Sequence, residues 1–211
     1  MRPPSNRERR GPIGTSETPQ HNPDEPPVLN VEGELVALGP LRRDLVPLYA
    51  RWMNDPATAR AVGTFAPFTV ERETDWYEKE ARSETNIPFT VYEKATLNPI
   101  GTVALMGVDY RNRRAEFGIS IGEAEYRNKG YGTETTWLML DYAFDVVGLH
   151  SVMLGVFEFN HGAIRTYEKA GFKEIGRRRQ SYFANGRMWD EIWMDCLGPE
   201  FGSSGPGRST R

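Results

Sequence analysis

The most informative segment of this chain is Arg127-Asn128-Lys129-Gly130-Tyr131-Gly132-Thr133. It follows a strand-like pattern at 113–122 and leads into a helical pattern at 130–147. This layout binds phosphates, because the first N–H groups of a helix have no intrahelical acceptor and the helix dipole favours anions there. Its glycines allow close approach of the backbone, and Arg127 and Lys129 add positive charge. The segment therefore predicts a phosphate-bearing ligand at the start of the helix.

The spacing excludes two other phosphate loops. A nucleoside-triphosphate loop needs Gly-x-x-x-x-Gly-Lys-Ser/Thr, and the sequence contains no Gly-Lys-Ser/Thr. A dinucleotide fingerprint needs Gly-x-Gly-x-x-Gly, but Thr135 stands where its third glycine would be. On the loop alone, a turn with a glycine pair and two solvated basic residues remains an equal alternative.

The patterns around this loop predict an α+β domain. Downstream we expect a strand at 151–157, a helix at 160–170 ended by Gly171, and strands at 172–182 and 187–197 joined by a turn at Ala184-Asn185-Gly186. Upstream we expect strands at 87–94, 99–108 and 113–122, the last with Ala115, Phe117, Ile119 and Ile121 on one face. Before these lie an expected strand at 35–38, a helix from Leu45 to Trp52 that ends at Asn54-Asp55-Pro56, and a helix at 69–82 with Trp76, Tyr77 and Ala81 inward. Successive strands with few helices between them predict an antiparallel meander followed by a crossover.

Composition divides the chain into one domain and two tails. Residues 1–28 hold seven of the 15 prolines and few large apolar side chains, so we expect a disordered tail there. Residues 198–211 are rich in glycine and serine and are expected to form a second, flexible tail. Residues 29–197 then form a single domain without an internal repeat.

Charge and cysteine usage exclude several classes of protein. The 26 Lys and Arg residues against 29 Asp and Glu give a net charge of −3, which argues against a nucleic-acid or anionic-membrane partner. The single cysteine, Cys196, excludes a disulfide framework, and the three dispersed histidines predict no metal site. No segment approaches the ~18 apolar residues of a membrane helix, and no apolar region follows the N-terminal arginines. We therefore expect a cytoplasmic protein.

Two segments resemble a known family. Arg127-x-x-Gly130-x-Gly132 resembles the Arg/Gln-x-x-Gly-x-Gly/Ala signature of the GNAT superfamily of N-acetyltransferases, and residues 160–172 resemble its Asn-x-x-Ala-x-x-x-Tyr-x-Lys-x-Gly-Phe helix. Residues 113–117 and 183–187 resemble the spermidine and ribosomal-protein N-acetyltransferase branch. The resemblance covers residues 29–197. It implies a GNAT-like α+β fold, a mixed and mainly antiparallel central sheet flanked by helices, with acetyl-CoA as cosubstrate.

The resemblance also implies site residues. The cofactor-binding positions are Ile119, Ile121, Arg127, Asn128, Lys129, Gly130, Tyr131, Gly132, Thr133 and Asn160. By the same resemblance, Tyr167 is the general acid for the leaving thiolate and Glu116 is the base for the amine. Each has an ordinary alternative: Tyr167 as a core tyrosine, Glu116 as an exposed strand glutamate, and Asn160 as a helix cap.

The expected reaction is direct transfer of an acetyl group from acetyl-CoA to a primary amine of a small molecule, polyamine-like or aminoglycoside-like. The alternatives are a protein N-terminal acetyltransferase of the ribosomal-protein type and a non-catalytic acyl-CoA-binding regulator. Residues 55–80 are expected to form the acceptor wall, where Glu71, Glu73 and Asp75 face a cationic amine or simply favour the helix dipole. Cys196 lacks an activating neighbour, so an acyl-enzyme is not expected. Trp189 and Trp193 are expected to pack in the core, and a homodimer is left open.

Overall fold

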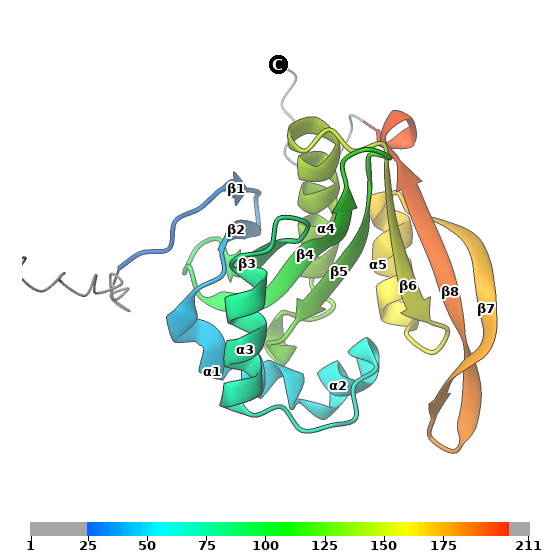
Figure 1. Cartoon of the computed structure of the whole chain (residues 1–211), viewed down its shortest axis with the longest axis horizontal. Coiled ribbons are helices and arrows are strands. Elements are labelled where there is room, and N and C mark those ends of the chain that lie inside the picture. Colours follow the sequence, from blue (N-terminus) through cyan, green and yellow to red (C-terminus); the bar gives the residue numbers. More distant parts are fainter. Residues whose placement is uncertain (1–24, 203–211) are drawn as a thin grey trace, which may run out of the picture.

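The computed structural model describes residues 25–202 and contains an eight-stranded sheet with helices on both faces (Figure 1). The strand order is β1-β2-β3-β4-β5-β6-β8-β7, and only β5 and β6 run parallel to each other. The predicted α+β class, with a mixed and mainly antiparallel sheet, is therefore confirmed.

The strands are β1 (Val31–Glu32), β2 (Val36–Pro40), β3 (Ile87–Glu93), β4 (Pro99–Asp109), β5 (Arg114–Ile121), β6 (Ser151–Phe157), β7 (Lys173–Ala184) and β8 (Arg187–Leu197). The α-helices are α1 (Val46–Met53), α2 (Pro56–Val62), α3 (Val70–Glu80), α4 (Tyr131–Asp141) and α5 (His161–Ala170). Short 3-10 turns lie at Arg43–Leu45, Ala124–Tyr126 and Gly198–Glu200.

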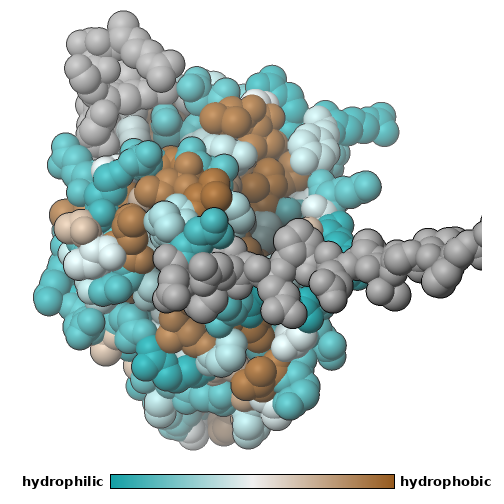
Figure 2. Space-filling model, turned by 90° about the vertical axis from the view of Figure 1, so that its left-hand side faces the viewer, coloured by the Kyte–Doolittle hydropathy of each residue, from teal (hydrophilic) through white to brown (hydrophobic). Residues whose placement is uncertain are grey.

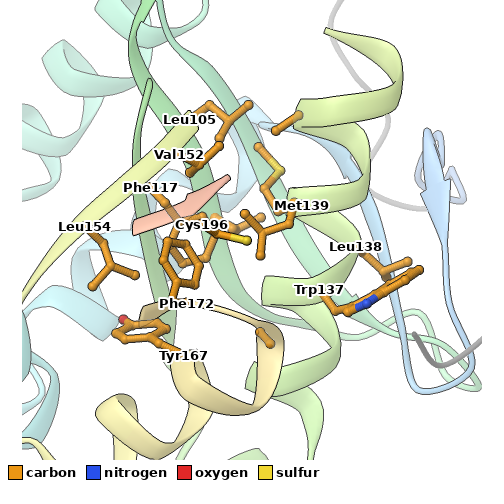
Figure 3. Close-up of a cluster of buried hydrophobic side chains, with 14 of the residues drawn as sticks. Leu105, Phe117, Trp137, Leu138, Met139, Val152, Leu154, Tyr167, Phe172 and Cys196 are labelled. Carbon is orange, nitrogen blue, oxygen red and sulfur yellow. The ribbon is translucent and has the colours of Figure 1, made fainter. Parts of the chain in front are cut away.

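The main core lies between the sheet and the helices α4 and α5. Alternate residues of β5 and β6 turn towards these helices, so Phe117 and Leu154 are buried while their neighbours are not. The ring of Phe117 packs against Tyr167 and Phe172, at centroid distances of 6.0 and 5.8 Å (Figure 3). This packing sets the position of α5, and with it the position of Tyr167.

A smaller core lies on the opposite face, under α1 and α3. Tyr49 and Trp52 of α1 are buried there with Trp76 and Tyr77 of α3 against them. The Tyr49 hydroxyl lies 2.5 Å from the Thr90 hydroxyl of β3, which attaches α1 to the sheet. On the outer surface around β1, β2, α1 and α3, hydrophobic groups are separated by hydrophilic side chains (Figure 2).

A buried glutamate fastens the β1–β2 turn to α4. The Glu134 carboxylate accepts hydrogen bonds from the backbone N–H groups of Glu34, Leu35 and Val36, at 2.6, 2.8 and 3.2 Å. Glu134 is only 4% exposed, so its charge is compensated by these donors. The turn therefore lies against the first turns of α4.

Helix α2 is not among the elements expected from the sequence, in which Asn54-Asp55-Pro56 marks only the end of a helix. The Asp55 side chain accepts a hydrogen bond from the Thr58 N–H and caps a new helix, with Pro56 at its first position. The same residues thus end α1 and begin α2.

Two expectations about helices also need correction. The helix expected at 130–147 is α-helical only to Asp141, and Tyr142–Val146 form one wider π-type turn, whose last bond runs from the Val147 N–H to the Tyr142 carbonyl. Ala81 is exposed rather than inward, because α3 ends at Glu80.

The C-terminal end of the packed region also differs from the expectation. Residues 198–202 are described, and the ring of Phe201 lies 5.4 Å from Trp137 and 5.3 Å from Phe144. Most of the two predicted tails, residues 1–24 and 203–211, lies outside the described residues.

Trp189 and Trp193 were expected in the core, but they are half-buried on the other face of β8 from Ile192 and Met194. The Trp189 ring packs against Phe159 and the guanidinium of Arg187 instead.

Candidate active site

The sheet opens between its two parallel strands. β5 and β6 are paired only at Arg114–Glu116 and Ser151–Met153, and beyond these residues they diverge (Figure 1). The backbone of each strand then lacks its neighbour along the opening, which leaves room for a ligand between Ser120 and Gly155.

A cavity of about 580 Å³ occupies this opening. Its lining comes from five places in the chain: α2, the end of β5, the 127–133 loop with the start of α4, the end of β6, and α5 with its N-cap Asn160. Of the predicted site residues, those that line it are Ile119, Ile121, Arg127, Asn128, Gly130, Gly132, Thr133, Asn160 and Tyr167. The structure therefore brings together nine of the twelve; it does not bring Lys129, Tyr131 or Glu116 to the lining.

The start of α4 is suited to an anion. Gly130, at φ 96°, is the N-cap residue and offers no side-chain acceptor to the helix. Among the described residues, none accepts a hydrogen bond from the N–H groups of Tyr131, Gly132 or Thr133. Gly132 and Thr133 line the cavity, so these donors are available to a phosphate.

The cations that face the cavity differ from those expected. Arg165 and Lys169 lie one turn apart on α5 and both line the cavity. Lys129 is exposed outside the lining, and Tyr131 packs edge-to-face on Tyr126, at 5.1 Å. The i,i+4 spacing of Arg165 and Lys169 was the sequence signal that these two cations share one face of the helix.

Arg127 was expected to add charge at the phosphates, but its side chain is engaged elsewhere. Its Nε donates to the Ile121 carbonyl at 2.9 Å, and Nη2 lies within 3.2 Å of the Gly122 carbonyl, Asp55 and Thr58. The guanidinium therefore joins the end of β5 to the start of α2.

Tyr167 lies at the inner side of the cavity. Only 9% of the residue is exposed, and burial raises the pKa of its hydroxyl to about 12. In Figure 3 its oxygen points away from Phe172 and Cys196. Within the described part of the chain, burial is the sole cause of the raised pKa and no hydrogen bond contributes to it, so the hydroxyl can donate to a ligand.

Glu116 does not reach the opening. It is exposed on β5 where that strand is still paired, opposite Met106 and Met153. A second carboxylate, Glu191 of β8, is also outside the lining but lies against it: a Cβ atom placed on Gly155, a lining residue, would lie 2.7 Å from Glu191 Oε1. The Glu191 side chain is 21% exposed and has a long ion pair of 3.9 Å to Arg178. Sequence reasoning missed Glu191, because only the sheet pairing brings β8 beside β6.

An aromatic stack lies at the C-terminal end of α2. We use this name for Phe65, Phe157, Phe159 and Tyr182. Tyr182 lies 3.9 Å from Phe157 and 6.5 Å from Phe65, with both ring pairs nearly parallel. A Cβ atom placed on Gly63, which follows the lining residue Val62, would lie 2.9 Å from the Phe157 ring and 3.4 Å from the Tyr182 ring, so the stack lies against the end of α2.

The predicted acidic residues of α3 lie elsewhere. Glu71, Glu73 and Asp75 are absent from the cavity lining. Glu73 is buried, and desolvation raises the pKa of its carboxyl group. The part of the 55–80 segment that lines the cavity is therefore α2, through Ala57, Thr58, Ala61 and Val62.

Asn160 caps α5, with its side-chain oxygen 3.2 Å from the Ala163 N–H, and it lines the cavity as well.

Cys196 is buried, and desolvation raises the pKa of its thiol to about 11, which disfavours a nucleophilic thiolate. Residues 25–202 contain no group of three His, Cys, Asp or Glu side chains that could hold a metal ion. Within the same residues, no helix has both the length and the apolar composition needed to cross a bilayer.

Residues 36–173 match the family model of the acetyltransferase (GNAT) domain. The spermidine N(1)-acetyltransferase of Vibrio cholerae serotype O1 is 37% identical over 121 residues, which are 57% of this chain and 69% of that protein. The mouse alpha/beta-tubulin-N-acetyltransferase 9 is 27% identical over 154 residues, 68% of this chain and 64% of that protein. A solved structure of the Vibrio cholerae spermidine N-acetyltransferase, in complex with CoA and spermine, matches with a TM-score of 0.73 at 28% identity, covering 79% of this chain and 98% of that chain. The family match includes every residue that lines the cavity.

Proposed function

This chain belongs to the GNAT acetyltransferase family and is an N-acetyltransferase, and we propose that it transfers the acetyl group of acetyl-CoA directly to a primary amine of a polyamine-like small molecule. The observation that carries the proposal is one continuous cavity, which joins the uncapped start of α4 to the opening between β5 and β6. One end suits phosphates and the other end lies beside Glu191 and the aromatic stack.

The cofactor end of the cavity fits acetyl-CoA, a cosubstrate that GNAT enzymes use. The N–H groups of Gly132 and Thr133 would hold its pyrophosphate, and Arg165 and Lys169 would add positive charge. The unpaired edges of β5 and β6 would align its pantetheine arm through backbone hydrogen bonds, and Asn160 would contact the same arm. When bound there, acetyl-CoA supplies an acetyl group activated as a thioester.

Tyr167 would stabilise the departing thiolate. Its hydroxyl is protonated throughout the neutral pH range, because its pKa is about 12. It would therefore donate a hydrogen bond to the sulfur as negative charge develops on it.

Glu191 would receive the acceptor amine. A carboxylate beside the opening attracts an ammonium group, and an amine must lose its proton before it attacks a thioester. The faces of the aromatic stack would hold the remaining positive charges of a polyamine by cation–π contact. The base role of Glu116 stays a prediction. We favour Glu191 for this role, because Glu116 lies where β5 is still paired with β6.

The test is a thiol-release assay with acetyl-CoA against spermidine, spermine, an aminoglycoside and peptides with free N-termini. We expect release with the polyamines at least about tenfold above that with the peptides. Preference for a peptide would favour a protein acceptor, as in the tubulin N-acetyltransferase named above. Release with none of the amines, although acetyl-CoA binds, would refute the proposal.

The same assay separates the two carboxylates. Glu191→Gln should lower kcat/KM for spermidine about tenfold or more, because the amide cannot accept the proton of the amine. Asp195→Asn is the matched control, because Asp195 lies on the same face of β8, two positions from Trp193 and opposite Met153. If Glu116→Gln has the large effect and Glu191→Gln has none, the base is Glu116.

A further inference from the structure

We propose that Arg127 is a positioning residue that couples the cofactor loop to helix α2, and that it is not a ligand of the cofactor phosphates. The inference rests on the proposed function in one respect, namely that the acceptor amine enters beside α2. Arg127 is the first residue of the glycine motif that begins the cofactor loop. In this proposal its side chain acts on the binding of the acceptor amine.

The contacts of the guanidinium carry this assignment. Nε donates to the Ile121 carbonyl, and Nη2 lies 2.8 Å from the Gly122 carbonyl. Nη2 also lies 2.9 Å from the Thr58 hydroxyl and 3.2 Å from Asp55 Oδ1. Two carbonyl oxygens, a hydroxyl and a carboxylate therefore hold one side chain, which would lose all of these contacts if it turned towards a phosphate.

Asp55 makes this arrangement electrostatically favourable. The start of a helix carries a partial positive charge, which by itself would repel a guanidinium. The Asp55 carboxylate lies between the two: Oδ1 accepts from the Thr58 N–H at 2.9 Å, from its hydroxyl at 3.1 Å and from Arg127. Hydrogen bonds from Thr58 and Arg127 lower the pKa of Asp55, so the carboxylate remains ionised around neutral pH.

Helix α2 depends on such contacts. It has seven residues, and isolated helices shorter than about 12 residues are unstable in water. Of its residues only Thr58 is buried, and the cavity-lining Ala57, Ala61 and Val62 have the open cavity on one side. Arg127 and Asp55 therefore fix the end of α2 that is nearest the cofactor loop.

The arrangement predicts an energetic coupling between the two substrates. The backbone of Arg127 begins the loop that leads into α4, and its side chain holds α2. Ordering of the loop by CoA would order α2 through this side chain, and the affinity for the amine would then rise when CoA is bound.

The test compares Arg127→Gln and Asp55→Asn with the unaltered protein. Asparagine is as good a helix cap as aspartate, so Asp55→Asn removes the charge and leaves α2 capped. Arg51→Gln is the matched control, because Arg51 makes an ion pair with Glu123 close by, on α1 rather than α2. Three quantities are measured: amide hydrogen exchange of residues 56–62 with and without CoA, the Kd of CoA, and the KM for spermidine.

We expect both variants to exchange about tenfold faster in residues 56–62, with exchange in β6 unchanged. CoA should slow this exchange in the unaltered protein and in Arg51→Gln but not in the two variants. The KM for spermidine should rise about fivefold, while the Kd of CoA changes less than about threefold. The double variant should be no worse than Arg127→Gln alone, because Arg127→Gln already removes the contact with Asp55.

A loss of CoA affinity of about tenfold in Arg127→Gln, with no effect of Asp55→Asn, would overturn the assignment and make Arg127 a phosphate ligand. Unchanged exchange in residues 56–62 of both variants would also overturn it. Exchange and CoA affinity do not require a polyamine acceptor, so these readouts remain decisive if spermidine is not a substrate.

Discussion

Replacing Tyr167 by phenylalanine removes one hydroxyl group from the inner side of the cavity and leaves the aromatic packing in place. The ring lies 6.0 Å from Phe117 and 5.9 Å from Phe172, and phenylalanine keeps both contacts. We expect kcat to fall and the affinity for acetyl-CoA to stay nearly constant, because the hydroxyl acts on charge that develops only in the transition state.

The size of the effect follows from the pKa of the hydroxyl. Burial raises this pKa to about 12, while a thiol has a reference pKa of about 8.5, so complete proton transfer to the thiolate is uphill by about 5 kcal/mol. Tyr167 therefore acts mainly by hydrogen bonding to the sulfur. A hydrogen bond to a charged acceptor contributes about 1.5–3 kcal/mol, so the expected fall in kcat is about 10- to 150-fold.

The pH profile gives a second readout. A group with a raised pKa keeps its proton until the pH approaches that pKa, so Tyr167 should remain a donor up to about pH 11. Deprotonation of Tyr167 should therefore not lower the kcat of the unaltered enzyme between pH 7 and about pH 10. Over this range the pH profiles of the unaltered enzyme and of Tyr167→Phe should have the same shape.

The assay is steady-state thiol release with spermidine, together with calorimetry of CoA binding and thermal unfolding. Tyr92→Phe is the matched control, since Tyr92 is a buried tyrosine of β3 outside the cavity. It should leave kcat within about twofold of the unaltered enzyme. A kcat for Tyr167→Phe equal to that of Tyr92→Phe would remove Tyr167 from the mechanism, and so would a loss confined to CoA affinity.

Three more predictions test the cofactor loop and its support. In calorimetry, Arg165→Gln and Lys169→Gln should each raise the Kd of CoA about 3- to 10-fold and weaken the dependence of this Kd on salt. Lys173→Gln is the control and should change neither, because Lys173 lies outside the cavity and is paired with Glu200. Gly130→Ala should destabilise the protein by about 1 kcal/mol, because Gly130 has φ 96°, and it should also weaken CoA binding. Gly186→Ala, at φ 76° in the β7–β8 turn, is the control: it should destabilise the protein and leave the Kd of CoA unchanged. Glu134→Gln should lower the free energy of unfolding in urea by about 1–3 kcal/mol, because it weakens three hydrogen bonds to the β1–β2 turn; an unchanged unfolding midpoint would contradict this role.

Local signals were sufficient for most of the element order. Gly171 has φ 111° at the end of α5, and Asn185 and Gly186 form the β7–β8 turn with φ 53° and 76°. Such positions predict structure from sequence because their backbone angles are costly for most residues. Asp55-Pro56 shows the limit of this reasoning, since the same residues are compatible with a helix end and with a helix start.

Charged side chains were predicted less well than the backbone. Arg127 and Lys129 look equivalent in the sequence, yet the first is held by four groups from β5 and α2 and the second is exposed. The flexible ends of long side chains go where partners from distant segments meet them, and no local pattern records those partners.

The sequence by itself determined the family, the α+β class and the backbone of the cofactor loop, because glycine spacing and alternating hydrophobicity act over a few residues. Only the tertiary structure decided which charges face the cavity. It directed Arg165 and Lys169 of α5 to the cavity, placed Glu191 of β8 beside the lining residue Gly155, and left Glu116 where β5 is still paired with β6. The physical reason is that these positions depend on strand order and on where β5 and β6 separate, which are consequences of packing between residues far apart in the chain.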